Sequence, residues 1–104
     1  MKYGYKDFEK DILYGIKLAE KELQERKNGI EGESTIKQLE DCILPELRDL
    51  LNKMQNREEL PPNTQQDRYL MSFGNALMAW TWDIHHPTKL FDQLRKIHSS
   101  YRKI

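Results

Sequence analysis

Apolar residues recur along most of the chain at steps of three or four, the spacing that keeps side chains on one face of an α-helix. The first such run ends at Asn28-Gly29, where glycine readily takes the left-handed conformation of a helix C-cap. The spacing therefore predicts a first helix over about residues 5–27. Its apolar stripe is Tyr5, Phe8, Ile12, Ile16, Ala19 and Leu23.

The same spacing returns from Ile36 to Met54, with Ser34 or Thr35 as the N-cap of a second helix. Pro45 lies inside this helix, lacks an amide hydrogen and clashes with the carbonyl four residues before it. We expect the second helix to be kinked or split near Pro45. The apolar frame continues past the proline, which favours a kink.

Two further apolar stripes follow the proline-rich linker at residues 56–63. The third stripe is Leu70, Phe73, Leu77, Trp80 and Ile84, and the fourth is Leu90, Leu94, Ile97 and Tyr101. The third predicts a helix from about Thr64 to about His85, and the fourth predicts one over about residues 88–102. Four helices with short connections predict an all-α, up-down-up-down antiparallel four-helix bundle that forms a single domain over residues 1–104.

Two glycines fall inside predicted helices, although each costs about 1 kcal/mol relative to alanine there. They are Gly15 in the first helix and Gly74 in the third. We expect a close helix contact, or a large neighbour such as Trp80, to fill the space beside them.

The net charge is zero, but the charges are unevenly distributed. Residues 28–60 hold eight acids and four bases, whereas residues 87–104 hold five bases and one acid. Either the two regions pack beside each other, or one of them meets a partner of opposite charge. With its single cysteine, Cys42, and no long apolar run, the sequence predicts a cytoplasmic protein without a membrane span.

Candidate chemistry is sparse. Asp83, His85 and His86, with His98 downstream, are residue types that bind metals, but no pair of histidines has the i, i+4 spacing of a zinc helix. We interpret this cluster as a structural helix end. Cys42 has no histidine nearby, and the sequence contains no glycine-rich phosphate loop and no Glu-x-x-His motif. We therefore expect a protein without enzymatic activity, cofactor or metal.

Protein binding is the leading hypothesis. Trp82 and Tyr14 fall off the stripes of their helices, so a partner covers them or a neighbouring helix does. Acids between residues 31 and 49 would suit a basic partner. We expect a non-enzymatic interaction module, of the kind of a bacterial inhibitor or immunity protein that masks its partner. The candidate contact residues are Trp82, Tyr14, Glu31, Glu33, Glu40, Asp41 and Asp49.

Two alternatives use the same features. The exposed aromatic residues could join two copies of the chain in a homodimer with a structural or regulatory role. The basic C-terminal helix could instead lie on the phosphates of a nucleic acid, which the neutral charge of the whole chain disfavours.

Overall fold

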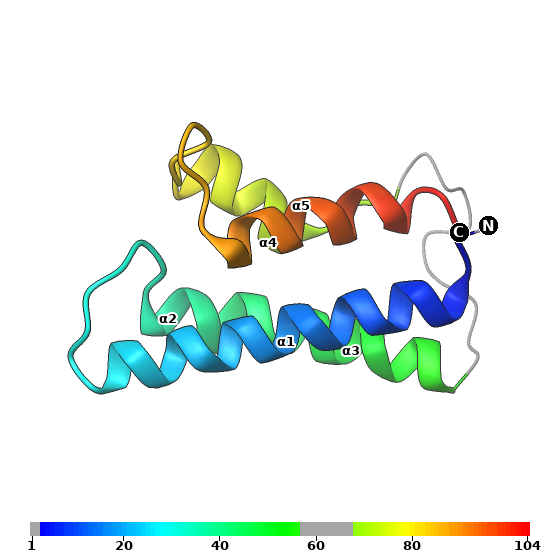
Figure 1. Cartoon of the computed structure of the whole chain (residues 1–104), viewed down its shortest axis with the longest axis horizontal. Helices are drawn as coiled ribbons and strands as arrows, with labels where there is room; N and C mark the ends of the chain where they lie inside the picture. The colour runs from blue at the N-terminus through cyan, green and yellow to red at the C-terminus, as the bar shows by residue number, and fades with distance from the viewer. Residues whose placement is uncertain (1–2, 57–67) are drawn as a thin grey trace.

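The computed structural model describes residues 3–56 and 68–104, and over these residues the chain forms helices and loops without a β-strand (Figure 1). The helical elements are α1 (Tyr5–Lys27), α2 (Ile36–Gln38), η1 (Leu39–Ile43), α3 (Leu44–Gln55), α4 (Met71–Gly74), η3 (Asn75–Ala79) and α5 (Lys89–Tyr101), where η marks a π-helical turn. Residues 57–67, which hold most of the predicted linker and the predicted cap at Thr64, lie outside the described residues.

The elements join into four helical segments that pack together, because α2, η1 and α3 abut, as do α4 and η3. The all-α prediction is therefore confirmed, whereas the up-down-up-down order stays a prediction. Helix α1 packs against both α3 and α5 (Figure 1). Its predicted bounds are confirmed, and its buried side chains are Phe8, Ile12, Ile16 and Ala19.

Gly15 allows α1 to approach both neighbouring helices closely. A Cβ atom at this position would lie 2.8 Å from Cδ1 of Ile97 on α5 and 3.4 Å from Cδ1 of Leu47 on α3. The predicted close helix contact at Gly15 is confirmed. At Gly74 a large neighbour fills the space as expected, but this neighbour is the ring of Tyr69 rather than that of Trp80.

The second helical segment begins at a capping box. Thr35 Oγ1 accepts a hydrogen bond from the Gln38 amide at 3.0 Å, and the Gln38 side chain accepts one from the Thr35 amide at 3.1 Å. Helical backbone then continues through Pro45. The turn before it is π-helical, and the proline lies in the first turn of α3. A bend of the axis at Pro45 stays a prediction.

The third helix is shorter than the sequence predicts. Residues 68–70 are not helical, and helical backbone ends at Ala79 rather than near His85. The cause is Thr81, whose φ of +50° is left-handed, a conformation that a β-branched residue takes only at a steric cost and that cannot continue the helix. Ile84, which the stripe placed in the core, is consequently 57% exposed.

The fourth helix follows the prediction within one residue at each end. Thr88 caps it by accepting a hydrogen bond from the Phe91 amide at 3.1 Å. The predicted stripe is buried, and it consists of Leu90, Leu94, Ile97 and Tyr101.

Two polar side chains fasten the third segment to its neighbours, and sequence reasoning missed both. Glu46 on α3 accepts hydrogen bonds from the amides of Met71 and Ser72, each at 2.7 Å, and from Ser72 Oγ at 2.6 Å. His98 on α5 accepts one from the Leu70 amide through Nδ1 at 3.1 Å. Its ring lies against those of Tyr69 and Phe73, with centroids 5.1 and 4.9 Å away.

The His98 contact predicts a loss of stability in mild acid. Burial, and the charge of Arg102, lower the pKa of His98 below its ordinary value of 6.5, while Glu46 acts in the opposite direction. The unfolded chain therefore takes up the proton first as the pH falls. The contribution of His98 is fully present above about pH 6.5 and declines below it.

Chemical denaturation at several pH values between about 7 and about 5 measures this loss. We expect His98→Gln to lower the slope of unfolding free energy against pH, and His85→Gln, at an exposed histidine, to leave it unchanged. An unchanged slope in His98→Gln would show that another group carries the effect.

Candidate interaction surface

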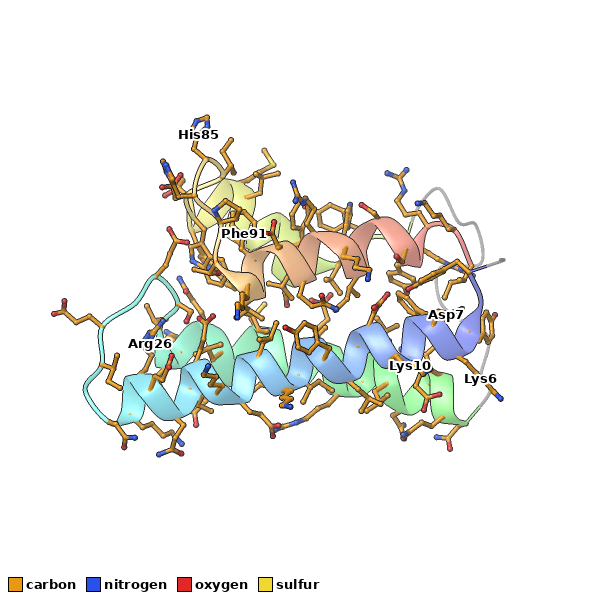
Figure 2. All side chains as sticks on the ribbon, in the orientation of Figure 1. Lys6, Asp7, Lys10, Arg26, His85 and Phe91 are labelled. Atoms are coloured by element: carbon orange, nitrogen blue, oxygen red, sulfur yellow. The ribbon has the colours of Figure 1, made fainter. Side chains whose placement is uncertain are left out.

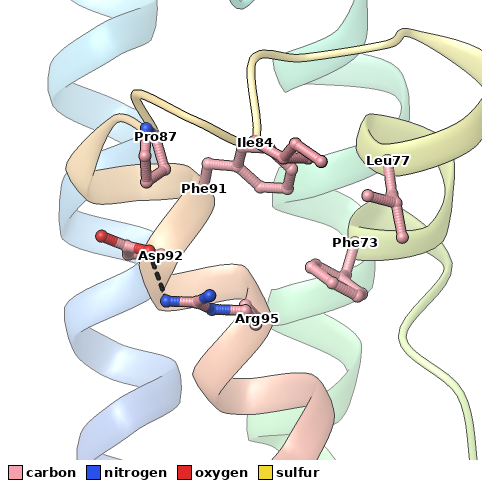
Figure 3. Close-up of a pocket in the computed structure, with 7 residues that line it drawn as sticks. All are labelled: Phe73, Leu77, Ile84, Pro87, Phe91, Asp92 and Arg95. Atoms are coloured by element: carbon pink, nitrogen blue, oxygen red, sulfur yellow. Dashed lines mark hydrogen bonds and ion pairs between the residues drawn. The ribbon is translucent and has the colours of Figure 1, made fainter.

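An apolar pocket of about 290 Å³ opens between η3, the loop after it and the start of α5 (Figure 3). Phe73 and Leu77 lie one turn apart on the third helical segment, and the ring of Phe73 lies 5.9 Å from that of Phe91 on α5. Ile84 and Pro87 enter from the loop. We call this feature the apolar pocket; its lining is Phe73, Leu77, Ile84, Pro87, Phe91, Asp92 and Arg95.

Large apolar side chains around the pocket are open to solvent. Leu77 on η3 is 40% exposed, and Ile84 in the loop after it is 57% exposed. Met78, which is also on η3, is 76% exposed. Methionine is flexible and polarisable, which suits a surface that adapts to a partner. This region of the protein therefore exposes apolar surface of the kind that marks an interaction site on a monomer.

A second hollow, of about 500 Å³, lies between α1 and α5 next to the pocket. Tyr14, which falls off the apolar stripe of α1, forms part of this hollow. It is 47% exposed, which agrees with the alternative in which a partner, rather than a neighbouring helix, covers it. We call it the tyrosine hollow; its lining is Tyr14, Lys89, Asp92, Gln93, Arg95, Lys96 and Ser99. Asp92 and Arg95 form an ion pair at 2.8 Å (Figure 3). Both residues line both features, so the apolar pocket and the tyrosine hollow adjoin each other.

Trp82 is not an exposed contact residue. It is 4% exposed, and its ring packs edge-on against Phe91 and lies beside Trp80, with both centroid distances 5.6 Å. Among the described residues its Nε1 has no hydrogen-bond partner. Of the two alternatives for Trp82, a partner or a neighbouring helix, the structure agrees with the second, because Phe91 of α5 lies against its ring.

Three of the predicted acids have contacts within the chain. Glu33 accepts a hydrogen bond from the Asp83 amide at 2.7 Å, which joins the loop after α1 to the loop after η3. Glu40 pairs with Lys27 at 3.2 Å, and Asp49 pairs with Lys53 at 3.0 Å.

The other two acids, Glu31 and Asp41, are exposed and line different hollows. Glu31 lies in the loop that Arg26 holds by donating from Nε to the Ser34 carbonyl at 2.6 Å (Figure 2). The five acids therefore do not share one site.

Helix α1 contacts both the acidic region and the basic one and forms an ion pair with each. Arg48 of α3 pairs with Glu20 of α1 at 3.1 Å, and Lys96 of α5 pairs with Asp11 of α1 at 3.3 Å. Among the described residues no ion pair is found between the acidic segment and α5. Direct packing of the two regions was one of the two expectations, and it stays a prediction.

The Asp83 and histidine cluster forms a turn in the loop after η3. The amides of His85 and His86 donate to Asp83 Oδ1 at 2.9 and 3.2 Å, and these bonds lower the pKa of the Asp83 carboxyl. His85 points away from the helices (Figure 2), and His98 lies apart against Tyr69 and Phe73. In the part of the chain that the structure describes, no three potential ligands gather around a metal position.

Cys42 is half-buried beside α4. Its Sγ lies 3.7 Å from Ser72 Oγ and 3.6 Å from Asn75 Nδ2. Ser72 is fully buried and donates to Glu46, so these side chains act in packing and helix attachment.

Comparison of the chain with known protein families, with curated proteins and with solved structures gave no match. Within residues 3–56 and 68–104, none of the helices has the length and apolar character required to cross a bilayer.

Proposed function

We propose that this protein is a non-enzymatic interaction module that binds another polypeptide through the apolar pocket and the tyrosine hollow. The observation that supports this most is the open apolar pocket, in which Leu77 and Ile84 remain largely exposed. A pocket lined by apolar side chains with a few polar groups at its rim is the usual form of a binding site.

The surrounding fold supports this role. Phe91 is buried beneath the pocket, and Trp82 packs against it from the side of the core, so the floor of the pocket is held in place. In this proposal the helices belong to the predicted up-down-up-down bundle, bent at Pro45, which presents α5 and η3 as a rigid face. Masking a partner in the cytoplasm, as a bacterial inhibitor or immunity protein does, is one action that such a face permits.

The acidic surface proposed from the sequence has less support. Glu33, Glu40 and Asp49 are engaged within the chain, which leaves Glu31 and Asp41 in separate hollows. The homodimer and the nucleic-acid alternatives would both use the face formed by η3 and α5, so one experiment separates all three.

The test is affinity capture from a lysate of the source cells with the full chain, comparing Ile84→Ser with Ile30→Ser. Both isoleucines lie in loops and are similarly exposed, at 57% and 54%, but only Ile84 lines the apolar pocket. We expect Ile30→Ser to retain a stoichiometric protein partner and Ile84→Ser to bind it roughly tenfold more weakly.

Equal retention by both variants would contradict the proposed surface. Recovery of nucleic acid alone would favour the basic-helix alternative. A doubled mass in solution that Ile84→Ser abolishes would favour the homodimer.

A further inference from the structure

The surface next to the apolar pocket is basic. Lys89, Arg95 and Lys96 line the tyrosine hollow, and Lys10 and Lys17 lie one turn to either side of Tyr14 on α1. All five bases are exposed. The acids among them are Asp11 and Asp92, which pair with Lys96 and Arg95.

Part of this positive charge is available to a partner. Lys10, Lys17 and Lys89 take part in no ion pair among the described residues. The pair between Arg95 and Asp92 joins side chains that are 65% and 48% exposed, and such surface pairs contribute little to stability. Arg95 can therefore turn toward a carboxylate of a partner at small cost.

The apolar pocket adds a second requirement. Ile84, Leu77 and Pro87 offer contacts to an apolar side chain and none to a phosphate. Tyr14 presents an aromatic ring and a hydroxyl to the same partner. A polypeptide that carries an apolar anchor beside carboxylates meets all of these groups, whereas a nucleic acid leaves the pocket unused.

We infer that the partner segment is an acidic amphipathic polypeptide, with an apolar side chain in the apolar pocket and carboxylates against the bases around Tyr14. This inference rests on the proposed function, and it gives the partner the opposite charge to the one that the acidic segment of the sequence suggests. Complementary charge at such a rim sets specificity and the rate of association.

A random peptide library displayed against the immobilised full chain tests the inference, with depletion on the Ile84→Ser variant. The enriched peptides are then measured against Lys89→Glu and Lys37→Glu by fluorescence anisotropy. Both lysines are exposed residues in the first turn of a helix, where an acid is favourable, so neither change should unfold the protein. Of these two lysines, only Lys89 lines the tyrosine hollow.

The expected result is a set of peptides with apolar residues flanked by acids, which bind wild type and Lys37→Glu equally and Lys89→Glu roughly tenfold more weakly. Peptides that depend on Ile84 but show no excess of acids, or that bind Lys89→Glu equally well, would overturn the inference and leave the proposed function standing. If no peptide depends on Ile84, both fail. Displacement of the peptides by a single-stranded oligonucleotide with a steep salt dependence would overturn the inference in favour of a nucleic acid.

Discussion

Replacement of Trp82 by alanine is expected to lower the free energy of unfolding by about 3–5 kcal/mol, the usual cost of deleting a large buried aromatic side chain. Trp82 is 4% exposed and packs against Phe91, which itself forms part of the apolar pocket. Domains are stable by only about 5–15 kcal/mol, so this change removes a large fraction of the total. Chemical denaturation followed by circular dichroism measures the loss.

Two variants make this prediction specific. Ile84→Ala, two residues further along the same loop and largely exposed, should change the free energy of unfolding by less than about 0.5 kcal/mol. Trp82→Phe should cost much less than Trp82→Ala, because it keeps an aromatic ring against Phe91 and removes the buried Nε1–H, which has no partner among the described residues. A near-neutral Trp82→Ala would mean that the side chain is exposed in solution. Trp82→Ala is for the same reason a poor probe of binding, since any lost affinity could follow from unfolding.

Glu46→Ala is expected to lower the free energy of unfolding by about 2–3 kcal/mol. The carboxylate of Glu46 accepts three hydrogen bonds at the start of α4, and Ser72, which supplies two of the donors, is fully buried. Its loss leaves buried donors without an acceptor, which costs more than the bonds themselves contribute. Thermal and chemical denaturation of the purified variant measure the effect.

Comparison with Glu40→Ala and Glu46→Gln separates this role from a general effect of charge. Glu40 is an exposed acid on η1 whose ion pair with Lys27 lies at the surface, so its removal should cost at most about 1 kcal/mol. Glu46→Gln keeps one acceptor oxygen and should lie between wild type and Glu46→Ala. If Glu46→Ala matched Glu40→Ala, the attachment of α4 would have to depend on apolar packing alone.

Only part of the candidate surface could be predicted from the sequence. Tyr14 was found because it falls off an apolar stripe, and the structure leaves it exposed as that position suggests. The same argument failed for Trp82, because it assumed that the helix continued past Trp80. Leu77 and Ile84 were assigned to the core by their spacing, but both line the apolar pocket. Ile84 lies there because the helix ends before it, at Ala79.

The sequence by itself determined the helices whose spacing pattern and caps lie within a few neighbouring residues. The bounds of α1 and α5 follow from side-chain spacing and caps within a few residues, which the sequence shows directly. The N-cap of the second helix was predicted at Ser34 or Thr35, and the structure has it at Thr35. The burial of the α5 stripe, and of the α1 stripe from Phe8 to Ala19, follows from the same periodicity, whereas Tyr5 of the α1 stripe is 41% exposed.

Only the tertiary structure decided where the third helix ends and what that end creates. Trp82, one residue beyond the left-handed Thr81, packs against Phe91, nine residues away, and no local pattern specifies that contact. Glu46 and His98 reach Ser72 and Leu70 across 26 and 28 residues of sequence. The apolar pocket likewise combines three segments whose side chains meet only after folding, because periodicity gives the side of a helix on which apolar residues lie but not the neighbour that covers them.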